Sequence, residues 1–122
     1  MAQPRHFLSA ADVADVFGAL SDPTRRHLFQ TLASSGSLTA TSLSADLAIS
    51  RQAVSKHLGI LVDAGMATST RVGRETRFEA DVTPLGDVTA WVRSVESQWD
   101  TRLQTLSASL GDKRQNNRGA GD

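Results

Sequence analysis

The chain has 122 residues, of which 39% are hydrophobic and 21% are charged. This length fits one globular domain with one packed core and excludes a second catalytic domain. The 13 basic and 13 acidic residues cancel, so the distribution of charge carries more information than its sum. Five basic against three acidic residues give the segment 49–79 a net charge of +2, which places the positive charge in the middle of the chain.

The sequence contains no cysteine, which excludes disulfides, thiolate metal sites, cysteine nucleophiles and iron–sulfur clusters. The three histidines do not occur at the i, i+3 or i, i+4 spacing that places two ligands on one helical face, so no metal and no cofactor is expected. No apolar run reaches the roughly 20 residues of a membrane span. Asp12 and Asp15 interrupt any secretory apolar segment. We therefore expect a cytoplasmic protein with no membrane partner.

Residues 8–20 carry apolar side chains at helical intervals, which predicts a short first helix. Asp22 followed by Pro23 matches an N-cap with a proline at the first helical position, where the missing N–H costs nothing. A second helix is therefore expected from Pro23 to about Ala33, where a run of Ser and Gly ends it.

Two further helices are predicted with only a brief turn between them. Thr39 can cap a short helix that ends near Ala48. Ser50 can cap a longer helix that runs to Ala64, with Gly65 at the position where helices commonly end in left-handed geometry. The predicted order is thus helix, tight turn, helix.

The helix that Ser50 begins is expected to be amphipathic. Val54, Leu58 and Leu61 fall on one side of a helical wheel, and polar residues that include Lys56 fall on the opposite side. Recognition helices enter the major groove by their N-terminal end with such a polar face. A plain solvated surface helix is the alternative, and only the neighbouring elements argue against it.

Alternation from Met66 to Val72 and again to Ala80 predicts a β-hairpin with its turn at Gly73 and Arg74. Guanidinium groups on or beside that turn can reach a phosphate or the minor groove. The alternative is that these arginines only make the surface soluble, in pairs such as Arg77 with Glu75 or Arg71 with Glu79.

Thr83 and Pro84 repeat the cap-plus-proline signal and predict a last, long helix to about Leu110. Its apolar residues recur every three or four positions, as in a helix packed lengthwise against another helix. These residues are Leu85, Val88, Val92, Val95, Trp99, Leu103, Leu106 and Leu110. A second copy of the chain is the expected partner, and packing on the chain's own first two helices is the alternative. Residues 1–110 are thus expected to form the domain, and the polar residues 111–122 a disordered tail.

Three segments together resemble the ArsR/SmtB type of transcriptional repressor. Residues 17–26 look like the F-x-A-L-x-D-P-T-R opening of that family, and residues 43–65 are similar to its helix–turn–helix. Residues 71–74 match the turn of its wing. The resemblance implies a winged helix–turn–helix fold, mainly α with one β-hairpin and about five helices. It also implies a homodimer, with the first and last helices at the interface, that represses its own operon.

The sequence departs from the family pattern in its sensor positions. Residues 44–46 lack the Cys-x-Cys type metal box, and the last helix lacks the Asp/His set of the zinc sensors. Gly59 stands where the family often has a basic residue. Residues 99–106 resemble a subset of the family with a W-x-x-R-L-x-x-L ending, for which no single effector is implied. His57 is expected to be half-buried and bonded to a neighbouring backbone group, and contact with a DNA base is the alternative.

The leading prediction is a non-enzymatic homodimer that binds a palindromic DNA operator without a cofactor, its effector being unknown. A winged-helix module that binds a protein instead of DNA is the second hypothesis. Gln52, Ser55 and Lys56 are expected at or near bases, and Arg51, Arg74 and Arg77 at phosphates. The predicted DNA-binding residues are Ser50, Arg51, Gln52, Ser55, Lys56, Arg71, Arg74 and Arg77. The predicted dimer interface consists of Leu8, Phe17, Val88, Trp91, Val92, Val95, Trp99, Leu103 and Leu106.

Overall fold

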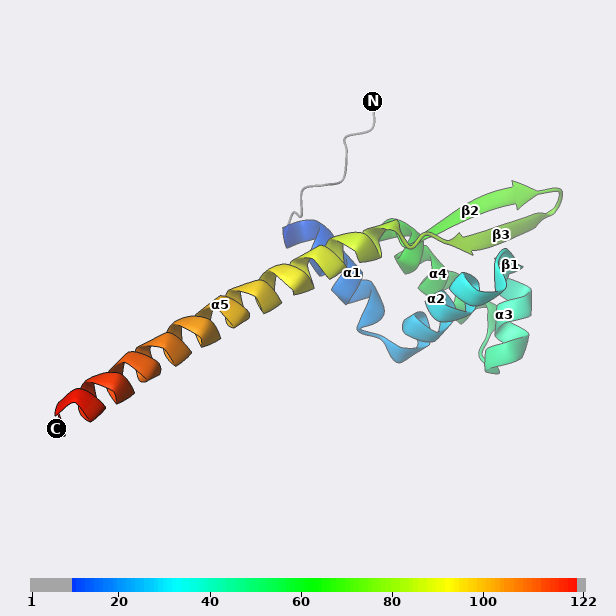
Figure 1. The fold of residues 1–122 in the computed structure, drawn as a ribbon. Coiled ribbons are helices and arrows are strands. Elements are labelled where there is room, and N and C mark those ends of the chain that lie inside the picture. The colour runs from blue at the N-terminus through cyan, green and yellow to red at the C-terminus, as the bar shows by residue number, and fades with distance from the viewer. Residues whose placement is uncertain (1–9, 121–122) are drawn as a thin grey trace, which may run out of the picture. The chain divides into compact units, whose positions relative to one another are not determined.

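The computed structural model describes the backbone of residues 10–120 and the side chains of residues 13–111. The elements follow in the order α1 (Ala10–Leu20), α2 (Pro23–Ser35), β1 (Leu38–Thr39), α3 (Ala40–Leu47), α4 (Arg51–Asp63), β2 (Ala67–Val72), β3 (Glu75–Ala80) and α5 (Thr83–Ala120) (Figure 1). This order confirms the predicted winged helix–turn–helix, mainly α with one β-hairpin. The chain forms two compact units, Met1–Thr89 and Ala90–Asp122.

Three of the helices in the first unit begin at the predicted caps. The side chains of Asp22, Thr39 and Ser50 each accept a hydrogen bond from the backbone N–H three residues further on, at 3.0–3.1 Å. The first turn of a helix leaves N–H groups without partners inside the helix, and each of these side chains satisfies one of them. The local sequence therefore determines where α2, α3 and α4 start.

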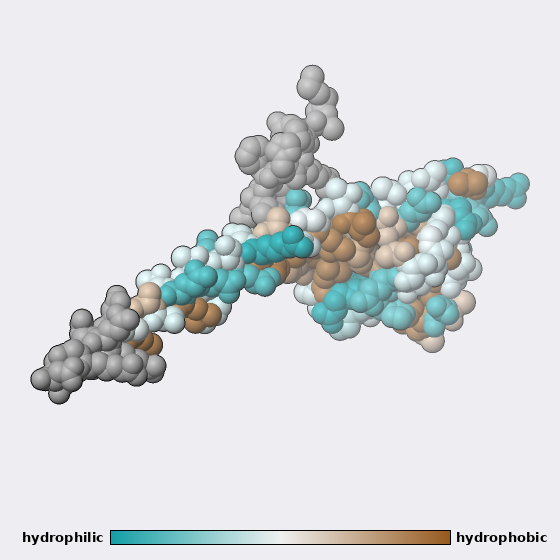
Figure 2. Space-filling model, in the orientation of Figure 1, coloured by the Kyte–Doolittle hydropathy of each residue, from teal (hydrophilic) through white to brown (hydrophobic). Residues whose placement is uncertain are grey.

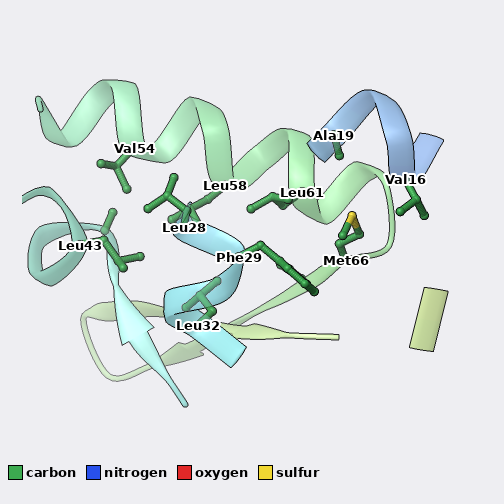
Figure 3. Packing of buried hydrophobic residues seen from close by; sticks show 12 residues of the cluster. Val16, Ala19, Leu28, Phe29, Leu32, Leu43, Val54, Leu58, Leu61 and Met66 are labelled. Carbon is green, nitrogen blue, oxygen red and sulfur yellow. The ribbon is translucent and has the colours of Figure 1, made fainter. Parts of the chain in front are cut away.

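The core of the first unit lies between α2 and α4 and extends to α1, α3 and the sheet (Figure 3). Val54, Leu58 and Leu61 of α4 are all 0% exposed, which confirms the predicted inner face of this helix. Burying a side chain of this size stabilises the fold by roughly 1.5–3 kcal/mol. The buried cluster consists of Val16, Ala19, Leu28, Phe29, Leu32, Ala40, Leu43, Val54, Leu58, Leu61, Met66 and Ala67.

The hairpin belongs to a three-stranded antiparallel sheet in the order β1-β3-β2. The sequence did not predict β1, because two residues are too few to show an alternating pattern. In β1, Leu38 pairs with Phe78 and Thr39 pairs with Arg77. Phe78 packs against the core, so β3 is held both by β1 and by the apolar interior.

Helix α5 runs through Ala120, so the predicted end of the last helix near Leu110 is wrong. Gly111 alone does not stop a helix, since a glycine in a helix costs only about 1 kcal/mol relative to alanine. No proline follows Pro84. The division of the chain at residue 110 into domain and tail stays a prediction.

In the second unit, every side chain from Ala90 to Gly111 is exposed. Apolar residues recur among them, and Figure 2 shows the brown patches that interrupt the polar surface of α5. No helix in the described part of the chain is both long and apolar enough to cross a membrane.

Candidate nucleic-acid interface

Helix α4 presents the polar face that the sequence predicts. Arg51, Gln52, Ser55 and Lys56 are all exposed, while the opposite face of the helix lies in the core. Gln52 and Lys56 lie one turn apart in the N-terminal half of α4. Because the core holds the inner face rigidly, these polar groups project from a fixed support.

The turn between α3 and α4 brings the two helices into contact and leaves the start of α4 open. Ala48 ends α3 in the left-handed region, with φ 55° and ψ 34°. Ile49 is half-buried against the core, and Ser50 then begins α4. Residues other than glycine rarely adopt this left-handed conformation. Because an alanine adopts it here, no glycine in the sequence marks the turn.

The β2–β3 hairpin forms the wing. Its turn is made by Gly73 and Arg74, and Gly73 has φ +62°, as the first central residue of a tight hairpin turn requires. The Nε of Arg71 donates a hydrogen bond to the carbonyl oxygen of Gly73 at 3.3 Å. Arg71 and Arg74 are both exposed, so their guanidinium groups remain accessible to a ligand.

A groove of about 580 Å³ joins these elements. Its walls come from the start of α3, from the exposed face of α4 and from the wing, and three arginines line it. The lining residues are Thr39, Ala40, Thr41, Ser42, Arg51, Ser55, Arg71, Arg74, Glu75, Thr76 and Phe78. Guanidinium and hydroxyl groups that converge in this way can donate several hydrogen bonds to phosphate oxygens.

Arg77 is placed differently from the other wing arginines. Its Nε donates to Ser37 Oγ and its Nη2 to the Ser37 carbonyl oxygen, both at 2.9 Å. Its Nη1 forms an ion pair with Glu75 Oε2 at 2.9 Å. The Arg77–Glu75 pair that the sequence suggested is therefore present, although both residues lie on β3. Arg71 pairs with Thr76 across the hairpin rather than with Glu79.

His57 lies on the side of α4 that faces the protein. It is half-buried as expected, but its partner is a side chain, since Arg25 Nη1 lies 3.5 Å from His57 Nδ1. Arg25 also donates to the carbonyl oxygens of Ala19, at 2.8 Å, and Gly18, at 3.2 Å. The sequence did not predict this arginine, which links the end of α1 to α4.

Asp22 is a charged cap in the same region. The backbone N–H of Arg25 donates to its carboxylate, and this hydrogen bond is the main reason why the pKa of Asp22 lies below its ordinary value of 3.8. Desolvation of the carboxyl opposes this shift by raising the pKa, and the electrostatic effects of His57 and Arg25 lower it further. The folded protein therefore favours the ionised form of Asp22.

Most of the predicted dimer residues are exposed. Phe17 is 46% exposed, and the six predicted residues from Trp91 to Leu106 are 39–54% exposed. Val88 packs against the core of the first unit, and Leu8 lies outside the described residues. The guanidinium carbon of Arg102 lies 5.8 Å from the centroid of the Trp99 ring, which is within cation–π range.

Metal coordination has no visible donor set in the described residues, since no three His, Asp or Glu side chains there are grouped so that they could hold an ion.

Comparisons with known proteins match this geometry. The helix–turn–helix domain family matches residues 20–70. The transcriptional repressor SdpR of Bacillus subtilis (strain 168) is 33% identical over 89 residues, which cover 73% of this chain and 98% of that repressor.

Solved structures give the same result. An ArsR-like transcriptional regulator from Rhodococcus sp. RHA1 is 38% identical and covers 79% of this chain and 90% of its own, with a TM-score of 0.71. A homodimeric winged helix–turn–helix DNA-binding domain from Mycobacterium bovis has the same fold at 21% identity, covering 80% of this chain and 92% of its own, with a TM-score of 0.58. The chain belongs to the ArsR family of winged helix–turn–helix transcriptional regulators.

Proposed function

We propose that this regulator is a homodimeric repressor that binds a palindromic operator, acts on its own operon and has no enzymatic activity. The observation that carries the proposal is the arginine-lined groove beside the exposed N-terminal half of α4. A duplex that receives α4 in its major groove needs a neighbouring surface that neutralises its phosphates, and the groove supplies three guanidinium groups for this purpose.

Gln52 and Lys56 are proposed to read bases. Both are exposed, and they occupy successive turns at the N-terminal end of α4, which is proposed to enter the major groove of the DNA. Glutamine can pair through two hydrogen bonds with adenine, and lysine can donate to guanine, each good contact being worth roughly 1–3 kcal/mol of discrimination. Ser55 lines the groove and is proposed to lie near the edge of the base contacts.

Arg51, Arg71 and Arg74 are proposed to hold phosphates of the DNA backbone. They come from α4 and from both sides of the wing turn, yet all three line the same groove. The backbone N–H groups at the capped start of α4, after Ser50, are proposed to add a contact, since the N-terminus of a helix favours anions. Such contacts fix the position of the protein on the duplex but carry no sequence information.

Dimerisation is proposed through the exposed apolar residues of α5, together with Phe17 and Leu8 of the N-terminal part of the chain. Exposed tryptophan, valine and leucine side chains at helical spacing gain free energy when a second copy covers them. The homodimeric domain from Mycobacterium bovis supports this proposal at the level of the fold. Two protomers would then read two half-sites roughly 34–36 Å apart.

The test starts with the DNA that the protein binds in cells. The protein is cross-linked to DNA in cells and precipitated, and the recovered DNA is sequenced. The enriched duplex is then compared with a scrambled duplex in a binding assay at several salt concentrations. We expect the recovered DNA to contain an inverted repeat from the region upstream of the gene that encodes this chain. Recovery of no specific DNA, together with a stable protein complex, would favour the protein-interaction module instead.

Matched variants make the assay specific. Gln52→Ala should lose discrimination between operator and scrambled duplex, whereas Gln30→Ala, an exposed glutamine of α2 outside the groove, should not. Arg74→Ala should weaken binding to both duplexes, whereas Arg26→Ala, an exposed arginine of α2, should weaken neither. Equal effects in each matched pair would contradict the assignment of the groove to DNA.

A further inference from the structure

The two faces of the wing hairpin differ in what they carry. Residues that pair directly across an antiparallel ladder point to the same face, and successive residues alternate between faces. Arg71 pairs with Thr76, and Phe78 lies two residues further along β3 on the same side. All three line the groove. Arg77 pairs with Thr70 and therefore lies on the opposite face of the hairpin; it does not line the groove, although Glu75 of the same face does.

All three nitrogens of the Arg77 guanidinium group already bind the protein. Each of its three nitrogens donates a hydrogen bond at 2.9 Å, two of them to Ser37 and one to Glu75. The carboxylate of Glu75 also balances its charge. The side chain is only 35% exposed. A phosphate would have to displace these partners before Arg77 could bind it, which is costly for a partly buried charged group.

Ser37 ties this arginine to the other wall of the groove. It follows Gly36, which ends α2, and precedes β1 and the Thr39 cap of α3. The ladder between β1 and β3 has only two residue pairs, so backbone hydrogen bonds alone hold these segments together weakly. The bonds from Arg77 to Ser37 bridge a sequence separation of 40 residues at that point.

We infer that Arg77 is a positioning residue: it fixes the wing against the start of α3 and so sets the width of the groove that receives the DNA backbone. This inference rests on the proposed function and replaces the phosphate contact that the sequence assigned to Arg77. Arg71 and Arg74 can meet the same stretch of backbone as Arg51 only while the two walls keep their spacing. Arg77 thus acts on DNA through the other arginines.

The decisive variant is Arg77→Lys, which keeps the positive charge but cannot reproduce the forked hydrogen bonds to Ser37. We expect operator affinity to fall about tenfold, the loss that corresponds to about 1.4 kcal/mol, with the slope of log affinity against log salt unchanged. Arg74→Ala should instead make that slope shallower by about one unit per protomer. Arg26→Lys is the matched control and should change neither quantity.

Ser37→Ala tests the same contact from the other side without touching any charge. It should lower affinity in the same direction as Arg77→Lys, and the double variant should lose no more than Arg77→Lys alone. A wild-type affinity in Arg77→Lys, combined with a shallower salt slope in Arg77→Ala, would assign Arg77 to a phosphate and overturn the inference. Additive losses in the double variant would also overturn it.

Amide hydrogen exchange separates this inference from the proposed function. In the free protein, Arg77→Lys and Ser37→Ala should each speed exchange at Leu38 and Thr39 of β1, relative to the buried amides of α4. Unchanged exchange in β1 would contradict the positioning role even if the protein binds DNA. If the wild type binds no DNA, the proposed function fails, and faster exchange in β1 would still support Arg77 as the link between wing and α3.

Discussion

Helices α4 and α5 carry the same kind of apolar periodicity but use it in opposite ways. Val54, Leu58 and Leu61 of α4 are fully buried by the chain's own α2 and its neighbours. From Val92 to Leu110, the stripe of α5 is 39–57% exposed. Period alone therefore identifies an apolar face but not its partner, since the free energy of burial is the same whether the same chain or a second copy covers the face.

The largest expected effect comes from breaking the stripe of α4. Leu58→Ala should lower the free energy of unfolding by about 2–5 kcal/mol, because it leaves a cavity in a packed core. The loss should not depend on protein concentration, which chemical denaturation at two concentrations measures. Leu106→Ala, the same change on the exposed stripe, is the matched control, and its effect should depend on concentration.

The stripe of α5 is tested by Leu103→Asp and Trp99→Ala. A charge in a dimer interface or the loss of a buried aromatic should weaken dimerisation by about 3 kcal/mol or more, roughly a hundredfold. Analytical ultracentrifugation measures the dissociation. Both tryptophans, Trp91 and Trp99, lie in the second unit, so their fluorescence reports on this helix alone. A monomeric wild type would contradict the proposed dimer.

The two faces of α4 should also differ from each other. Gln52→Ala and Lys56→Ala should each reduce the discrimination between operator and scrambled duplex by roughly 1–3 kcal/mol while leaving the folding stability nearly unchanged. Competition binding at fixed salt measures this ratio. If both affinities fell by the same factor, these residues would only position α4, and base reading would pass to Arg51 or Ser55.

Acid should weaken the first unit through Asp22. The pKa of this carboxyl is lowered in the folded state, so its ionised form stabilises the fold at pH values well above the ordinary value of 3.8, and this contribution is lost as the pH falls through the lowered value. The melting temperature of the wild type should therefore drop more steeply below about pH 4 than that of Asp22→Asn, since asparagine caps a helix without a charge. Parallel curves would contradict the prediction.

The smallest expected effect is at the turn between α3 and α4. Ala48 has φ 55°, a conformation that costs an L-residue roughly 1–2 kcal/mol. Substitution by glycine removes this cost, but the greater conformational freedom of glycine in the unfolded chain offsets about 0.5–1 kcal/mol of the gain. Ala48→Gly should thus stabilise the first unit by about 0.5 kcal/mol, a rise of a few degrees in melting temperature measured by calorimetry. Ala45→Gly, inside α3, is the control and should destabilise.

Features that depend on neighbouring residues were predictable. The caps Asp22, Thr39 and Ser50 satisfy N–H groups three residues away, and the turn at Gly73 requires a positive φ, so a short window of sequence contains the whole cause. The resemblance carried by residues 17–26, 43–65 and 71–74 was correct for the same reason, because these local motifs are what the family shares.

Features that depend on distant residues were not predictable. Strand β1 exists because β3 offers it a ladder, and Arg77 and Ser37 lie 40 residues apart in the chain. Arg25 and His57 are 32 residues apart. Arg77 and Arg25 could each bind a ligand or their own protein, and the polar groups that the fold places within reach of the guanidinium decide between the two.

The sequence by itself determined the family, the order of the elements, the starts of three helices and the two faces of α4, since these follow from local hydrogen bonding and from the 3.6-residue period. Only the tertiary structure decided that Arg51, Arg71 and Arg74 share one groove while Arg77 binds Ser37 and Glu75 instead. The physical reason is that a guanidinium group binds the polar groups that the fold places within its reach, and Ser37 lies within reach of Arg77 only because β1 pairs with β3.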